Sequence, residues 1–207
     1  LKAFRKQLKK DGKWEDVNAF DAGPVPEDNP PQEQWAEDEE ELEPAEATRY
    51  RANVARGNFM SQDRSDIQFT VKELSRSMAS PKRCDMTRLK RLARYLIKAQ
   101  RVKLIFRYMS LEEANRITVH SDTDFAGCQS TRRSTSGGAA MLGNCLVKHW
   151  SKTQSTISLS SGEAELHGIA MGCAQALGLQ SLLKDLGWEI KVKVLSDATA
   201  AIGIARR

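Results

Sequence analysis

The feature that most restricts the fold is a separation of charge along the chain. Residues 14–48 contain thirteen acidic residues, no basic residue and five of the six prolines. Such a stretch cannot bury enough apolar surface to offset the conformational entropy lost on ordering. We therefore expect residues 1–48 to form a disordered arm, basic up to residue 13 and acidic after it, and the folded part to lie within residues 49–207.

The expected folded part carries the opposite charge. Residues 49–207 contain 26 basic and 13 acidic residues, although the whole chain has a net charge of only +5. A basic domain attracts polyanions such as nucleic acid. The acidic arm is interpreted as a solvated tether, and the alternative is that it imitates nucleic acid and screens the basic domain. Because no run of 18 apolar residues occurs, we expect no membrane span and an intracellular, cytoplasmic or nuclear location.

Residues 49–112 are expected to form a small helical region. Apolar residues spaced by a helical period predict one helix over residues 64–79; they are Ile67, Val71, Leu74 and Met78. A second helix is expected over about residues 82–99, with an apolar face made of Leu89, Leu92, Ala93, Leu96 and Ile97. Basic side chains surround that face and are candidate phosphate ligands; they are Arg88, Lys90, Arg91, Arg94 and Lys98.

Residues 113–207 show a regular order of elements. Short runs rich in β-branched residues alternate with helical patterns, which predicts the order β-β-β-α-β-α. A hairpin is expected around Gly143-Asn144, and a long helix is expected from Ser160 to about residue 186, where Gly187 ends it. The apolar run VKLIFRYM, residues 102–109, is expected to add a strand-like segment before this order begins.

Three carboxylates belong to the first strand, the long helix and the last strand of this pattern. They are Asp122, Glu165 and Asp197, and they can meet at one edge of a sheet as ligands for Mg²⁺ or Mn²⁺. Asp124 remains an alternative to Asp122, because residues two apart on a strand face the same side. Glu163 is the alternative to Glu165, although the two point about 200° apart on a helix and Glu163 is well placed as a capping acid.

The motifs around these carboxylates resemble a known family. SDTDFAG, TRRSTSGG, KHWSKTQSTISLSSGEAEL, LLKDLGW and SDATAAI resemble the ribonuclease H segment of copia-type retrotransposon Pol polyproteins. Upstream, RSDIQFTVKELSRSM and RLKRLARYL resemble the region that connects reverse transcriptase to that segment. The resemblance implies a ribonuclease H-like mixed sheet with flanking helices, C-terminally truncated, over residues 113–207.

The resemblance also implies a chemistry. Asp122, Glu165 and Asp197 fall on catalytic positions of the family, which uses Mg²⁺ or Mn²⁺ to cleave the RNA strand of RNA/DNA hybrids during reverse transcription. The implied partners are nucleic acid and the reverse transcriptase portion of the same polyprotein, within a cytoplasmic virus-like particle or the nucleus. Hybrids are recognised by 2′-hydroxyls and groove shape, so we expect little dependence on base sequence.

Two departures from the family pattern leave alternatives open. The chain has no Tyr-x-Asp-Asp polymerase motif, and it stops inside the helix after Asp197, where the family continues with another strand and helix. One alternative is therefore a catalytically inactive nucleic-acid-binding remnant of a retrotransposon Pol protein. Another is a nuclease or transposase that shares the architecture, because one fold hosts several phosphoryl-transfer reactions.

Overall fold

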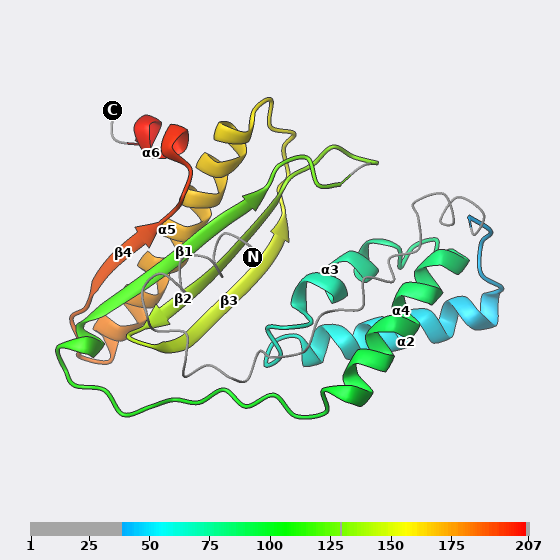
Figure 1. Cartoon of the computed structure of the whole chain (residues 1–207), viewed down its shortest axis with the longest axis horizontal. Coiled ribbons are helices and arrows are strands. Elements are labelled where there is room, and N and C mark those ends of the chain that lie inside the picture. Colours follow the sequence, from blue (N-terminus) through cyan, green and yellow to red (C-terminus); the bar gives the residue numbers. More distant parts are fainter. Residues whose placement is uncertain (1–38, 129, 206–207) are drawn as a thin grey trace. The chain divides into compact units, whose positions relative to one another are not determined.

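The chain folds into two compact units. A computed structural model of the 207 residues describes residues 39–128 and 130–205 (Figure 1). Within these, residues 39–103 form a helical unit and residues 104–205 form a sheet unit. Each unit has its own cluster of buried apolar side chains, so each is described by itself.

The helical unit consists of three helices around one core. These are α2 (Pro44–Met60), α3 (Gln68–Arg76) and α4 (Arg83–Lys98). Their shared core is made of Tyr50, Val54, Ile67, Val71, Leu74, Leu89 and Leu92. The hydroxyl of buried Tyr50 donates to the Leu74 carbonyl at 2.7 Å, which satisfies its polar end inside the apolar cluster.

Helix α2 corrects the expected extent of the disordered arm. The charge pattern predicts an arm that runs to residue 48, but α2 begins at Pro44 and buries Ala47. Proline is compatible with a first helical turn, and Glu46 favours the positive helix end. The acidic composition hid this start because helix formation here depends on packing of the following residues, such as Tyr50. Residues 1–38 of the expected arm, including its basic part, lie outside the described residues.

The other two helices agree with their expected apolar stripes, with changes at the ends. The stripe Ile67, Val71 and Leu74 is buried as expected, but α3 covers only residues 68–76 of the expected 64–79. Residues 61–67 form turns instead. Helix α4 lies close to its expected range, yet Ala93 is exposed and 69% of Ile97 is exposed, so its apolar face is narrower than expected.

The sheet unit confirms the expected order of elements. It contains η2 (Glu113–Asn115), β1 (Arg116–Asp124), β2 (Thr135–Leu142), β3 (Cys145–Thr153), α5 (Ser161–Asp185), β4 (Lys191–Leu195) and α6 (Thr199–Ala205). The strands form one mixed sheet in the order β3-β2-β1-β4, in which only the β1–β4 pair is parallel (Figure 1). Gly143 at the β2–β3 turn has φ +54°, and Gly187 after α5 has φ +81°, as those turns require.

Helix α5 packs on β1, β2 and β4 through its smallest residues. Four of them recur every fourth position and are buried: Ala164, Gly168, Gly172 and Ala176. They face the buried residues of β1, which alternate along that strand with more exposed ones. Because the contact face has almost no side chains, the backbone of α5 comes close to the sheet. This close approach fixes the position of the side chains in the first turns of α5 relative to the sheet.

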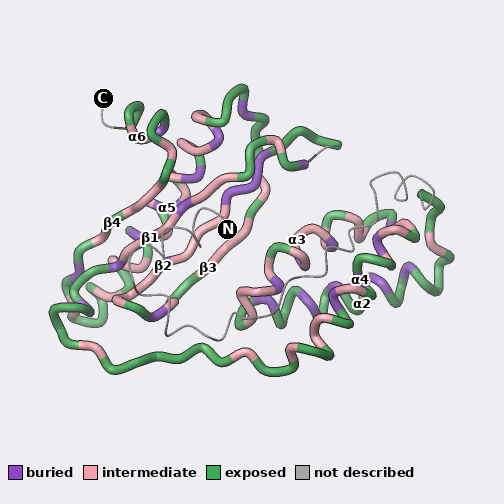
Figure 2. The backbone as a smooth tube through the Cα atoms, viewed as in Figure 1, coloured by how far each residue is buried: buried purple, intermediate pink, exposed green. Residues whose placement is uncertain are grey.

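One expected strand is absent. Residues 102–109 form no strand, and much of this connection is exposed (Figure 2). The exposed fractions are 62% for Phe106 and 100% for Tyr108. Strand preference depends on a neighbouring strand to pair with, and a β-prone composition alone does not supply one. Among the helices of the described part, none has the length and apolarity needed to cross a bilayer.

Candidate metal centre

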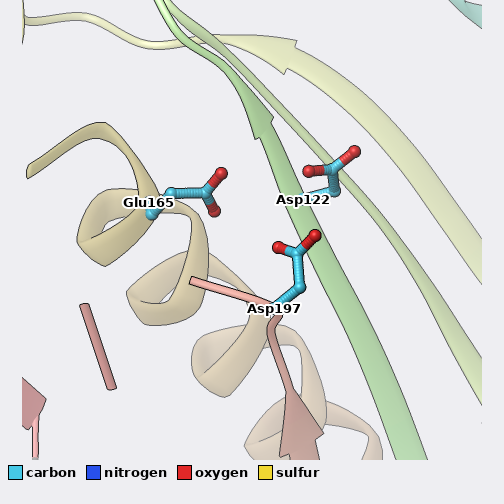
Figure 3. Close-up of side chains that lie close together, drawn as sticks. All are labelled: Asp122, Glu165 and Asp197. Atoms are coloured by element: carbon cyan, nitrogen blue, oxygen red, sulfur yellow. The ribbon is translucent and has the colours of Figure 1, made fainter. Parts of the chain in front are cut away.

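Three carboxylates meet at one edge of the sheet unit. One oxygen each from Asp122, Glu165 and Asp197 lies within 4.8 Å of the other two. Figure 3 shows the three side chains pointing toward one another from β1, α5 and the segment after β4. Asp122 and Glu165 are half-buried, and Asp197 is exposed. These are the three carboxylates that the sequence pattern selected.

The register of the sheet places the two aspartates side by side. Strands β1 and β4 run parallel, with His120 opposite Leu195. Asp122 and Asp197 each lie two residues beyond this pair. The two aspartates therefore lie at the same level, at the edge of the sheet where β1 and β4 end. The Asp122 carboxylate also accepts a hydrogen bond from the Thr123 amide at 3.0 Å.

The start of α5 separates Glu163 from Glu165. The Ser160 hydroxyl caps the helix by accepting from the Glu163 amide at 3.1 Å. The Glu163 carboxylate in turn accepts from the Leu159 amide at 2.7 Å, which is a reciprocal capping arrangement. Glu163 therefore serves the helix end, whereas Glu165 joins Asp122 and Asp197.

Asp124, the alternative on β1, is also outside the cluster of carboxylates. It is the last residue of β1 and is exposed. Its carboxylate lies over the Cα of Gly127, where a side-chain carbon would overlap it. In the described part of the β1–β2 loop that follows, φ is positive at Ala126 and at Arg132. Asp124 therefore points into this loop.

Glu165 has the most perturbed environment of the three carboxylates. Burial and, after it, the negative charges of Asp122 and Asp197 raise its pKa, Thr123 partly offsets them, and the combined result is a pKa of about 7. One of its oxygens, Oε2, is buried without a hydrogen-bond partner among the described residues. A buried carboxylate oxygen without a donor is costly, and a cation would satisfy it. The donor set, three carboxylates from separate elements, fits a hard ion such as Mg²⁺ or Mn²⁺.

The sequence interpretation missed a group of buried polar residues behind Glu165. Ser121, Ser136, Gln154 and Ser158 are all buried in the sheet unit. Ser121 and Ser136 lie where α5 approaches the sheet at Gly168, and Gln154 hydrogen-bonds to Ser136 and to Ser158. The repeat of small residues at every fourth position of α5 was the signal that could have indicated such a close contact.

The expected nucleic-acid ligands lie on α4, in the helical unit. Arg88, Lys90, Arg94 and Lys98 are exposed, and Arg91 is half-buried. Arg88 also pairs with Asp85 at 3.2 Å, so part of its charge is neutralised locally. An exposed basic helix face is compatible with phosphate contact.

The fold and the carboxylate cluster define the class of this domain. It is an α/β domain with a mixed four-stranded sheet and a cluster of three acidic residues, and it is compatible with a ribonuclease H-like architecture. No family model matches the chain, and no solved structure matches it. The relationship to known proteins therefore comes from sequence comparison.

Curated relatives connect the chain to transposons. It is 32% identical over 142 residues to the retrovirus-related Pol polyprotein from transposon RE1 of Arabidopsis thaliana, covering 68% of this chain and 9% of that protein. It is 35% identical over 129 residues to the uncharacterized mitochondrial protein AtMg00810 of Arabidopsis thaliana, covering 61% of this chain and 51% of that one. The chain is a retrotransposon Pol-related protein, and it spans about half or less of the length of these two relatives.

A further relative has a different name. The chain is 34% identical over 121 residues to the secreted RxLR effector protein 161 of Plasmopara viticola, covering 58% of this chain and 83% of that protein. The name of that protein describes secretion and no chemical activity. It adds a related sequence without changing the chemistry that the carboxylate cluster supports.

Proposed function

We propose that the sheet unit is a metal-dependent endonuclease that cleaves the RNA strand of RNA/DNA hybrids during retrotransposon reverse transcription. The observation that carries this proposal is the convergence of Asp122, Glu165 and Asp197 within 4.8 Å, from three segments far apart in sequence. The relationship to a Pol polyprotein supports it, because reverse transcription produces such hybrids.

The three carboxylates would hold Mg²⁺ or Mn²⁺. When bound, such ions lower the pKa of an attacking water and stabilise the leaving 3′ oxygen. Asp122 on β1 and Asp197 just after the adjacent parallel strand β4 would supply ligand oxygens, and Glu165 would supply one from α5. Because the pKa of Glu165 is raised to about 7, protons compete with the cation, and cation binding weakens as the pH falls below neutrality.

The basic face of α4 is proposed to hold the substrate. Its exposed side chains, Arg88, Lys90, Arg94 and Lys98, contact phosphates of the nucleic acid without reading bases. Recognition of 2′-hydroxyls and groove shape then distinguishes a hybrid from DNA. The reverse transcriptase portion of a Pol polyprotein is the proposed partner that delivers this substrate.

Cleavage of a labelled RNA/DNA hybrid in Mg²⁺ tests the proposal. We expect Asp122→Asn to lower the cleavage rate at least about 10²-fold, since it removes a ligand of the charge-stabilising ion. Asp124→Asn is the matched control, because Asp124 lies on the same strand and outside the carboxylate cluster. Equal activity of the wild type and Asp122→Asn would rule out the proposed site.

The same assay separates the proposal from its alternative. A catalytically inactive remnant would bind the hybrid in a salt-sensitive way, because the basic side chains of α4 remain exposed, and would cleave nothing. Single-stranded RNA and a DNA duplex serve as substrate controls. Cleavage of the DNA duplex at the rate of the hybrid would favour another nuclease chemistry on this fold.

A further inference from the structure

A single buried glutamine connects three elements behind the carboxylate cluster. Gln154 follows the last residue of β3, and only 5% of it is exposed. Its side-chain amide nitrogen donates to the Ser136 hydroxyl on β2 at 2.9 Å and to the Ala164 carbonyl on α5 at 2.9 Å. Its side-chain oxygen accepts from the Ser158 hydroxyl at 3.1 Å. Both amide hydrogens and the carbonyl oxygen are therefore used.

The bond to Ala164 acts on the residue next to Glu165. It attaches the first turn of α5 to β2 through Ser136, beside the place where the helix approaches β1. The approach is close at Gly168, where an added Cβ would overlap the Thr123 hydroxyl and lie 3.2 Å from the Ser121 hydroxyl. The backbone around Glu165 is thus fixed both by a close contact and by a hydrogen bond.

This attachment opposes an electrostatic force. Asp122, Glu165 and Asp197 lie within 4.8 Å of one another, so their negative charges repel when no cation is present. Glu165 is the only one of the three on a helix; the aspartates lie on or just after paired strands. Repulsion of Glu165 by the two aspartates therefore acts to move the first turn of α5 away from β1. The hydrogen bonds of Gln154 to Ala164 and Ser136 oppose that movement.

We infer that Gln154 is a positioning residue that fixes the first turn of α5, and with it Glu165, against Asp122 and Asp197. The inference rests on the proposed function for its consequence in cation binding. Its structural part, the attachment of α5, stands on the hydrogen bonds alone. Gln154 is assigned no direct role toward the cation or the substrate, because its side-chain amide bonds to groups within the protein.

Two variants of the 207-residue chain test the role. Gln154→Met keeps the size of the side chain and removes its three hydrogen bonds. Gln180→Met is the matched control, because Gln180 lies on the same helix as Glu165 and its amide donates to the Ile190 carbonyl at 2.7 Å, far from Glu165. Both variants remove a glutamine that bonds a main-chain carbonyl, so general loss of stability affects both.

The first measurement uses metal-free protein. Amide hydrogen exchange is followed over residues 164–169, where we expect Gln154→Met to accelerate exchange about 10-fold or more relative to the wild type by easing local opening. We expect Gln180→Met to leave exchange there unchanged. Equal exchange in the wild type and Gln154→Met overturns the inference, whether or not the chain has nuclease activity.

The second measurement addresses the cation. We expect Gln154→Met to weaken Mn²⁺ binding about 10-fold, as loss of residues behind metal ligands commonly does, and to lower kcat for hybrid cleavage with little change in KM. Gln180→Met should bind Mn²⁺ as the wild type does. Absence of Mn²⁺ binding in the wild type would reject the proposed function, and the exchange measurement would still decide the role of Gln154. Faster exchange with unchanged Mn²⁺ affinity would overturn the positioning of Glu165.

Discussion

The two units of the chain differ in the hydrogen-bond partners that they give to a carboxylate with buried oxygens. In the helical unit, Asp66 has a 4% exposed side chain, and Arg64 donates to both of its oxygens at 2.9 and 2.7 Å while Tyr95 donates at 2.8 Å. In the sheet unit, Glu165 has a buried oxygen without a partner among the described residues. A satisfied acid stabilises its unit, whereas a carboxylate oxygen without a donor is available to a cation.

The pKa values reflect this difference. Burial pushes the pKa of Asp66 upward, but the hydrogen bonds from Arg64 and Tyr95 and the positive charge of Arg64 outweigh burial and lower it. Burial also raises the pKa of Glu165, and there the neighbouring charges of Asp122 and Asp197 add to the rise, to about 7. The partners that surround each carboxylate, more than burial itself, distinguish a structural acid from a candidate ligand.

The largest expected effect on stability comes from removing the satisfied acid. Asp66→Ala leaves the Arg64 guanidinium, which has a 12% exposed side chain, without its buried partner. Breaking such a pair costs about 3 kcal/mol or more in the free energy of unfolding. Urea denaturation of the helical unit, followed by circular dichroism, measures the change. If the free energy of unfolding falls by less than about 0.5 kcal/mol, the range of ordinary surface substitutions, Asp66 is not the stabilising acid that we describe.

Replacing Glu165 is expected to have the opposite sign. The folded-state pKa of Glu165 lies above its ordinary value of 4.5, so its contribution to stability is full below that value and is lost as the pH rises through about 7. Glu165→Gln should therefore raise the Tm of metal-free protein at pH 8 by several degrees and change it little at pH 4.5. Calorimetric Tm values at both pH values give the result. A lower Tm at pH 8 would show that Glu165 is a structural acid like Asp66.

The smallest expected effect on stability belongs to the exposed basic side chains of α4. Combined replacement of Lys90, Arg94 and Lys98 by glutamine should change stability by less than about 0.5 kcal/mol for each site. It should reduce the dependence of log K on log salt for hybrid binding by about 0.9 for each phosphate that these side chains neutralise. Fluorescence anisotropy across salt concentrations checks this slope. An unchanged slope would place the substrate elsewhere.

The sequence predicted the sheet unit well because its signals are local. Alternation in β1, the turn glycine Gly143 and the cap residue Ser160 each specify an element from a few neighbouring residues. The separation of Glu163 from Glu165 also follows from helix geometry, and the structure places only Glu165 with the two aspartates.

Other features depend on contacts distant in sequence. Helix α2 begins within an acidic stretch because Ala47 and Tyr50 are buried. Residues 102–109 have a strand composition and no strand beside them, so the composition misled. The attachment through Gln154 joins β2, the loop before α5 and α5 itself, and no local pattern indicates which buried amide will bond a helix.

The claim that Glu165 is a cation ligand is tested most directly by the number of protons released when Mn²⁺ binds at pH 7. Glu165 has a pKa of about 7, so roughly half of it is protonated at this pH and must lose its proton to become a ligand. Calorimetric titration in buffers of different ionisation enthalpy should give about half a proton released per ion bound for the wild type and close to none for Glu165→Gln, which should also bind more weakly. Equal affinity and equal proton release in the two proteins would show that Glu165 is not a cation ligand.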